Sequence, residues 1–312
     1  MAYRDLNGAL RERFGKKVYK ISLSTPFTCP NRDGNKGVGG CLFCSAKGSG
    51  NFAADSQKSI SSQLEEGKRR VSAKLGTAPR GYIAYFQAFT STYGPVDIQR
   101  KLFTEAILDP EVVALSVATR PDCISQECLE LLSELNTVKP VWVELGLQTA
   151  KKETVALIRR NYENEEYLSA VRRLREKGIE VIVHLILGLP GEDHNDEIAS
   201  LTFALSVPVQ GVKFHLLHVL LGTGLAEMDY KAISMEEYVY RVTDLLRFVP
   251  RDVVIHRMTG DGDKKELLSP LWSGDKKRVL NAISRRIREE GIQQGSALKK
   301  RIKKNIKKQK NT

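Results

Sequence analysis

The feature that most constrains the fold is a regular alternation of short apolar segments with longer segments of helical periodicity. The apolar segments are rich in Val, Ile, Leu and Tyr, which predicts strands at residues 17–23, 82–87, 112–117, 141–147, 179–187, 211–218 and 253–256. The intervening segments have helical spacing, which predicts helices at residues 55–75, 97–108, 125–135, 151–159, 164–177, 193–206 and 235–248. Strands that alternate with helices favour a parallel sheet, because each helix carries the chain back to the same end of the sheet.

Repeated right-handed crossovers curl such a sheet toward a barrel. The sequence shows no complete set of eight units, so we expect an α/β fold with a partial barrel of about six strand–helix units, of the (β/α)6 type. Composition shifts sharply after the Trp-Ser-Gly stretch that ends at residue 274. We therefore expect a barrel domain at residues 1–274 and a basic, amphipathic helical extension at residues 275–312.

The charge of the chain is concentrated in this extension. Residues 276–312 contain fourteen Lys or Arg and two acidic residues, a net charge of +12 that equals the net charge of the whole chain. Apolar residues recur among the basic pairs, which predicts a basic amphipathic helix that frays after Gly295. Such a helix suits a nucleic acid, an anionic membrane surface or a solvated terminus, and the sequence leaves these three open.

The cysteines and the hydropathy indicate the compartment. Five cysteines, an odd number with three in one loop, do not read as a disulfide framework. No apolar run approaches the ~20 residues that a membrane span needs, and residues 1–6 lack the apolar core of a secretory signal. We expect a cytoplasmic protein without a membrane span.

Cys29, Cys41 and Cys44 lie in one loop, with the spacing C-x11-C-x2-C and with glycines at 34, 37, 39 and 40 between them. The loop follows the first predicted strand, at the edge of a βα barrel where catalytic residues gather. Thiolates held this close can surround one inorganic centre. Three ligands suit a 4Fe-4S cluster with one open iron, whereas a structural zinc site normally takes four. Taken alone, the loop is equally consistent with a zinc site or with a chance grouping of cysteines.

The loop, with Phe43 directly before the last cysteine, resembles the cluster loop of the radical SAM superfamily. In that family the open iron is chelated by the amino and carboxylate groups of S-adenosylmethionine. The first two cysteines here are separated by eleven residues in place of the usual three, a departure that one subgroup shares. The resemblance implies a radical SAM barrel at residues 1–274, a 4Fe-4S cluster on the three cysteines, and S-adenosylmethionine as the second cofactor.

Further candidates follow the other predicted strands. The resemblance implies contacts with S-adenosylmethionine from Phe43, Gln87, Thr90, Glu144, Gln148, Arg160, His184 and Gly188. The interval of twelve between Gln148 and Arg160, and the Gly-Leu-Pro-Gly-Glu turn that begins at Gly188, match the family. Three of these residues have a structural alternative: Thr90 could cap the next helix, His184 could be a core histidine, and a buried Glu144 needs a partner that is either ligand or protein.

A Thr-Arg-Pro-Asp stretch at residues 119–122 is very similar to one in the Elongator catalytic subunit, a relative that modifies wobble uridines. Arg120 could contact a carboxylate or a phosphate, or it could pair with Asp122. We name Arg120, Asp122, His218 and Arg257 as candidate substrate contacts. These motifs together, over residues 15–273, most closely resemble the YhcC/YtqA subgroup of radical SAM proteins. Cys123 and Cys128 are expected to be ordinary buried thiols.

The resemblance implies that a reduced cluster cleaves S-adenosylmethionine to a 5′-deoxyadenosyl radical, with electrons from a flavodoxin- or ferredoxin-type donor. The basic extension and the likeness to the Elongator subunit suggest an RNA-binding enzyme that modifies the C5 substituent of a tRNA wobble uridine. Two alternatives stay open. One is a radical SAM enzyme that acts on a small metabolite. The other is a non-catalytic, zinc-stabilised nucleic-acid-binding protein.

Overall fold

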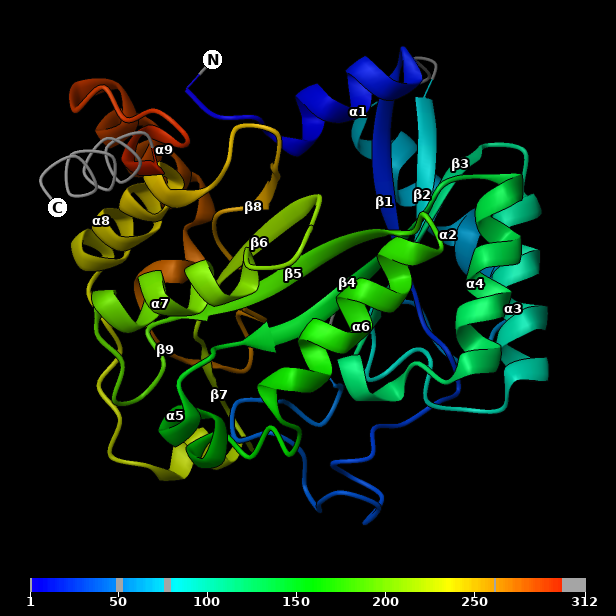
Figure 1. Ribbon diagram of the computed structural model, residues 1–312, viewed down its shortest axis with the longest axis horizontal. Coiled ribbons are helices and arrows are strands. Elements are labelled where there is room, and N and C mark those ends of the chain that lie inside the picture. Colours follow the sequence, from blue (N-terminus) through cyan, green and yellow to red (C-terminus); the bar gives the residue numbers. More distant parts are fainter. Residues whose placement is uncertain (1, 49–52, 76–79, 261, 299–312) are drawn as a thin grey trace, which may run out of the picture.

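The computed structural model describes residues 2–48, 53–75, 80–260 and 262–298. Within these residues, seven parallel strands form one curled sheet in which each strand pairs with the next along the chain (Figure 1). The strands are β1 (Lys17–Leu23), β2 (Arg80–Phe86), β3 (Val112–Thr119), β4 (Val141–Gln148), β5 (Glu180–Leu187), β6 (Gly211–Leu216) and β8 (Val254–Arg257). This open, partly closed barrel confirms the expected α/β fold class.

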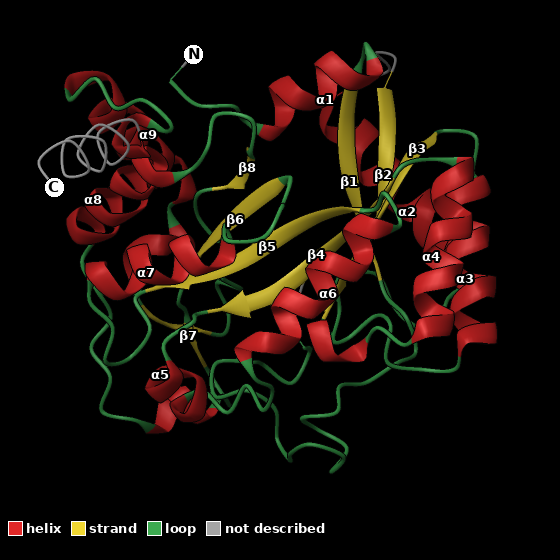
Figure 2. Ribbon diagram, in the orientation of Figure 1, coloured by secondary structure: helices red, strands yellow, loops and turns green. Residues whose placement is uncertain are grey.

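Helices cover the outside of the sheet (Figure 2). They are α2 (Ile60–Leu75), α3 (Val96–Leu108), α4 (Gln126–Val138), α5 (Lys152–Leu157), α6 (Asn164–Glu176), α7 (His194–Ala204) and α8 (Met235–Leu245). Side-chain caps set several of their starts: Ser125 accepts a hydrogen bond from the Cys128 amide, and Asp193 forms a capping box with Asp196. Their apolar faces join the outward side chains of the strands in the main core.

An apolar cluster packs at the amino-terminal end of the barrel interior. Helix α1 (Leu6–Phe14) lies across that end, opposite the loop that follows β1 (Figure 1). Its Leu10 packs on the first inward side chains of five strands, which are Val18, Ile83, Ala114, Trp142 and Ile182. Because side chains alternate between the two faces of a strand, the next inward residues lie one layer nearer the carboxyl end. A pocket of about 350 Å³ beside α1, lined in part by Leu10, Trp142 and His256, remains at the amino-terminal side.

Helix α9 (Lys276–Glu289) begins the predicted basic extension. Asp275 accepts a hydrogen bond from the Arg278 amide at 3.0 Å, and the helix packs on α8. Its Val279, Ile283 and Ile287 are buried and belong to the same main core as the barrel. The predicted helix is present and ends at Glu289, before Gly295. The domain division at residue 274 stays a prediction, and the basic residues from 299 onward lie outside the described residues.

A short antiparallel pair, β7 (Val219–Leu220) and β9 (Leu267–Ser269), was not expected from the sequence. Strands of two or three residues are too short to show an alternating pattern. The pair leads into a 3-10 turn at Gly224–Glu227, where the Leu225 amide donates a hydrogen bond to the Leu42 carbonyl at 2.9 Å. The segment therefore lies against the cysteine loop. No helix in the described ranges is long and apolar enough to cross a membrane.

Candidate functional site

A cavity of about 450 Å³ occupies the carboxyl side of the barrel interior, and each strand of the seven-stranded sheet found in the described residues contributes to its wall. Thirteen of the candidate residues line it: Cys29, Cys41, Phe43, Cys44, Gln87, Thr90, Arg120, Glu144, Gln148, Arg160, His184, His218 and Arg257. Gly188 and Asp122 are not part of the lining. Residues that the sequence separates by more than 200 positions thus meet around one space.

The cysteine loop is held by its own polar side chains. The Asn31 amide donates to the Cys41 sulfur at 3.4 Å and to the Arg159 carbonyl at 2.8 Å, so it ties the loop to the connection after α5. The Arg32 guanidinium donates to the carbonyl of Cys44 at 3.0 Å. Gly37 lies so close to Asn161 that a Cβ there would stand 2.6 Å from the Asn161 amide nitrogen. A larger residue at this position would displace the Asn161 side chain, which donates to the Lys36 carbonyl at 3.1 Å.

All three loop thiols face the cavity. Burial and the neighbouring Cys44 raise the pKa of the Cys41 thiol to about 11, so it is protonated at neutral pH unless a cation is bound nearby. In the described part of the chain no three His, Cys, Asp or Glu side chains converge closely enough to hold one metal ion. A 4Fe-4S cluster does not require such convergence, because each thiolate binds a different iron. The donor set of three thiols around one cavity fits such a cluster.

Gln148 ends β4 in a left-handed conformation, with φ of 63°. Only a minority of non-glycine residues adopt this conformation, and they concentrate at functional sites. With its amide oriented to donate, the Gln148 nitrogen bonds the carbonyls of Gly146 at 2.8 Å and Leu147 at 2.9 Å. The hydroxyl of Tyr162 donates to the same Gly146 carbonyl. The turn at the end of β4 is therefore fixed before any ligand binds.

The buried Arg160 uses all five of its N–H donors on the protein. They reach the carbonyls of Leu147 at 2.9 Å and Thr149 at 2.8 Å, the Tyr162 carbonyl twice, and Asn164 Oδ1 at 2.8 Å. A guanidinium with no spare donor can hold the shape of the wall but offers little to a ligand. Arg160 keeps the predicted place, and its contacts favour a positioning role.

Arg120 forms a bidentate ion pair with Asp122, at 3.0 and 2.9 Å, which is one of the two alternatives left open by the sequence. Lys36 of the cysteine loop donates to Asp122 at 2.6 Å. Burial would raise the pKa of Asp122, but the hydrogen bonds from Arg120 and Lys36 hold it below the usual value. The Thr-Arg-Pro-Asp stretch thus anchors the cysteine loop while Arg120 still faces the cavity.

The remaining candidates differ in their placement. Gly188 turns the chain with φ of 79°, and its amide donates to Glu197 Oε1 at 2.9 Å, outside the cavity wall. Thr90 lies in the wall, and the alternative that it caps the next helix is wrong, because α3 begins after Pro95. His218 faces Gly260, where a Cβ would stand 2.9 Å from the imidazole. Phe43 packs on the smaller apolar cluster beside the cavity.

The floor of the cavity is a polar layer that the sequence reasoning found only in part. Glu144 is fully buried and accepts hydrogen bonds from Ser116 at 2.7 Å, His184 Nε2 at 2.7 Å and Lys213 at 2.9 Å, and from Lys20. The partner of Glu144 that the sequence left open is therefore protein. Lys20 and Lys213 were missed, although a charged residue inside an apolar strand is the same signal that singled out Glu144.

The charged groups in this layer shift one another's pKa values. Burial would raise the pKa of Glu144, but Lys20 and Lys213 hold it well below the usual value. Burial lowers the pKa of Lys213 to about 7, although Glu144 opposes that change. Burial and then Lys213 lower the pKa of His184 to about 4, so this imidazole is neutral at pH 7. His184 is thus neither an isolated core histidine nor a cation.

Comparison with known proteins agrees with this geometry. A family model described as the radical SAM superfamily matches residues 28–204, and a radical SAM C-terminal domain model matches residues 209–289. YtqA of Bacillus subtilis is 42% identical over 94% of this chain and 92% of its own length. YhcC of Escherichia coli is 36% identical over 93% of this chain and 94% of its own length.

More distant relatives match parts of larger proteins. A tRNA uridine(34) acetyltransferase of Methanocaldococcus infernus is 28% identical over 57% of this chain and 36% of its own length. The solved structure of the archaeal Methanocaldococcus infernus Elp3, lacking residues 1–46, superposes with a TM-score of 0.67 at 18% identity. The match covers 89% of this chain and 64% of that chain, and at this identity it shows a shared fold.

Proposed function

The chain belongs to the radical SAM superfamily, and from that membership we propose that it is an enzyme that modifies tRNA, at the C5 substituent of a wobble uridine. The single observation that carries the enzymatic part is that the three thiols of the 29–44 loop face one cavity with the polar ends of the strands. The family uses a 4Fe-4S cluster and S-adenosylmethionine, which together supply a radical able to remove hydrogen from an unreactive carbon.

We propose that Cys29, Cys41 and Cys44 hold the cluster. The Asn31 amide, 3.4 Å from the Cys41 sulfur, would adjust its potential, since hydrogen bonds to sulfur do so in iron–sulfur proteins. The candidates on the S-adenosylmethionine side are Phe43, Gln87, Thr90, Gln148 and His184, which line the cavity, with Arg160 shaping the turn. We expect a flavodoxin- or ferredoxin-type donor and a reducing cytoplasm.

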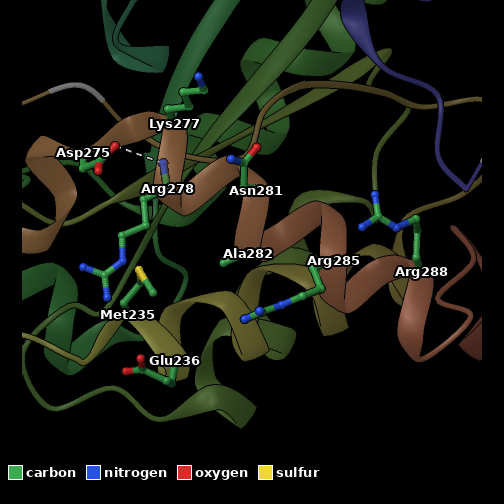
Figure 3. Close-up of a pocket in the computed structure, with 9 residues that line it drawn as sticks. All are labelled: Met235, Glu236, Asp275, Lys277, Arg278, Asn281, Ala282, Arg285 and Arg288. Carbon is green, nitrogen blue, oxygen red and sulfur yellow. Dashed lines mark hydrogen bonds between the residues drawn. The ribbon is translucent and has the colours of Figure 1, made fainter.

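The tRNA part is supported by a basic groove of about 680 Å³ along α9 (Figure 3). Burial of Val279, Ile283 and Ile287 fixes which face of α9 is exposed. Four basic side chains from the opposite face line the groove: Lys277, Arg278, Arg285 and Arg288. Within the described ranges none of these four pairs with a carboxylate, so their charges are available to phosphates.

Relatives support the same substrate class. The tRNA uridine(34) acetyltransferase shares sequence with more than half of this chain. The basic residues after Leu298, which lie outside the described residues, extend the same charge along the sequence. A substrate with a dense row of phosphates suits this distribution better than a small metabolite does, because a metabolite would need charge only in the cavity.

The decisive experiment compares the modified nucleosides of bulk tRNA from deletion and parent cells by mass spectrometry. We expect one C5-substituted uridine to disappear, with its precursor accumulating, and complementation by the wild-type gene but not by a Cys41→Ser variant. Unchanged tRNA with intact S-adenosylmethionine cleavage in vitro would favour the metabolite enzyme. Zinc in place of iron, with no cleavage, would favour the zinc-stabilised binding protein.

A further inference from the structure

The floor of the cavity carries more positive than negative charge. Lys20, Tyr85, Ser116, Glu144, His184 and Lys213 come from six consecutive strands and form this polar floor, next to the apolar cluster that contains Leu10 of α1. Two ammonium groups, those of Lys20 and Lys213, share the single carboxylate of Glu144. Lys213 also donates to the Tyr85 hydroxyl at 2.9 Å.

Nearby groups do not remove this excess. Neither lysine pairs with a second carboxylate among the described residues, and His184 is neutral at pH 7. Lys213 is buried, with a side chain only 7% exposed. A buried charge that is only partly compensated is costly, and groups with strongly shifted pKa values cluster at functional sites.

A second observation comes from His215, on the same strand and two residues nearer the cavity mouth than Lys213. Its ring lies 5.0 Å from the ring of His184, centroid to centroid, and it lines the cavity. Its Nε2 is buried and has no hydrogen-bond partner among the described residues. Burial and then His184 hold the pKa of His215 well below the usual value, so the imidazole is neutral and can donate one N–H.

From these two observations we infer that the floor of the cavity binds an oxyanion of the substrate, a carboxylate or a phosphate, between Lys213 and His215. This assignment rests on the proposed function, since it takes the cavity to be the substrate site. It adds that the group nearest the reacting carbon is anionic. The anion would complete the charge balance of the two lysines and accept the hydrogen bond that His215 otherwise lacks.

Small anions test this assignment on the full-length, cluster-reconstituted protein. Thermal unfolding is followed with increasing sodium acetate or sodium phosphate, against sodium chloride at equal ionic strength. We expect acetate or phosphate to raise Tm saturably, by about 2 °C or more beyond chloride. The more effective anion identifies the carboxylate or the phosphate as the preferred group. Equal effects of all three salts would overturn the assignment.

Variants locate the effect. Lys213→Met should abolish the increase in Tm that acetate or phosphate causes beyond chloride, and His215→Phe should reduce it. Lys68→Met is the matched control, because Lys68 is also largely buried and paired with carboxylates but lies on α2, away from the cavity. An increase in Tm beyond that in chloride that persists in Lys213→Met would place the anion elsewhere and contradict the assignment. If Lys213→Met does not fold, Lys213→Arg, which keeps the charge, should retain the rise.

Two further measurements separate the possible sources. Saturating S-adenosylmethionine should leave the acetate or phosphate effect in place; its loss would assign the site to the methionine carboxylate and overturn a substrate role. In NMR spectra of 13C-labelled lysine, one lysine should titrate near neutral pH, and its pKa should rise when the anion is added. If the anion binds but the tRNA of deletion cells is unchanged, only the proposal of an RNA substrate is contradicted. If the tRNA is altered but the anion does not bind, only the oxyanion site is contradicted.

Discussion

The Lys213 ammonium lies 2.9 Å from the Glu144 carboxylate, although 69 residues separate them in the chain. Lys20 and His184 reach the same carboxylate from two other strands. Because Ser116 of β3 also donates to it, Glu144 joins five strands of the sheet through polar side chains. Glu144 also lines the cavity that the three loop thiols face, so the network that stabilises the barrel also shapes the cavity.

Glu144→Gln should be strongly destabilising. The substitution leaves the buried Lys213 and the partly buried Lys20 without a counter-charge, and breaking a buried pair typically costs about 3–5 kcal/mol. Denaturant unfolding measures the loss. Glu134→Gln is the control, since Glu134 is 61% exposed and pairs with an exposed Arg100; it should change stability by less than ~1 kcal/mol. Similar losses in the two variants would show that the buried network contributes nothing beyond a surface pair.

His194 should make stability depend on pH above neutrality. Its Nε2 lies 3.0 Å from Asp244 and its Nδ1 3.4 Å from Glu197, so it joins α7 to α8. Burial opposes protonation, but the hydrogen bonds to Asp244 and Glu197 outweigh it and raise the pKa of His194 to about 9.

A His pKa raised on folding gives stability that is full below the unfolded pKa, ~6.5, and is lost as pH rises through the folded value. We expect the stability difference between wild type and His194→Gln to be largest below pH 6.5 and to shrink up to pH 9. Urea unfolding at several pH values measures it. A constant difference across this range would show that His194 is not charged in the folded protein.

Asn31→Ala should loosen the cysteine loop. It removes the hydrogen bonds to the Cys41 sulfur and to the Arg159 and Arg160 carbonyls, of which Arg160 keeps a bond from Arg120, and each lost hydrogen bond typically contributes about 0.5–1.5 kcal/mol. We expect less iron per chain after anaerobic reconstitution and a shifted reduction potential in the fraction that binds. Asn35→Ala, on the exposed side of the same loop, should behave as wild type. Normal iron content and potential in Asn31→Ala would contradict this role.

Single Cys→Ser substitutions at positions 29, 41 and 44 should each abolish the iron–sulfur absorbance. Cys123→Ser should keep it, because Cys123 does not line the cavity. Optical spectra and iron analysis measure the result. Retention of full iron by any of the three loop variants would mean that this thiol is not a ligand, and loss of iron in Cys123→Ser would mean that the ligand set extends beyond the loop.

Arg285→Glu with Arg288→Glu should weaken tRNA binding and its dependence on salt. Each phosphate contact contributes about one unit to the slope of log K against log salt, so the slope should fall by roughly two. Filter binding across a salt series measures both quantities. Arg172→Glu, an exposed basic residue on α6, is the control. Because α9 packs in the core, substitution is a cleaner test than deletion of residues 276–312. An unchanged slope would exclude the groove from RNA binding.

Local sequence was enough to predict the strands, most to within one or two residues, because each strand carries its own apolar pattern. It also located the cysteine loop, since three thiols and their glycines lie within sixteen residues. The two-residue strand β7 and the roles of Arg160 and Thr90 could not be predicted in this way. Those features depend on partners that are near in space but far along the chain.

The amino-acid order by itself determined the parallel sheet and which loop offers the sulfur ligands, because βα periodicity and cysteine spacing are properties of neighbouring residues. Only the tertiary structure decided that Lys20 and Lys213 meet at Glu144, and that α9 buries one face and exposes its cations on the other. Strand register and helix packing set those distances, and both depend on contacts between segments that no local pattern specifies.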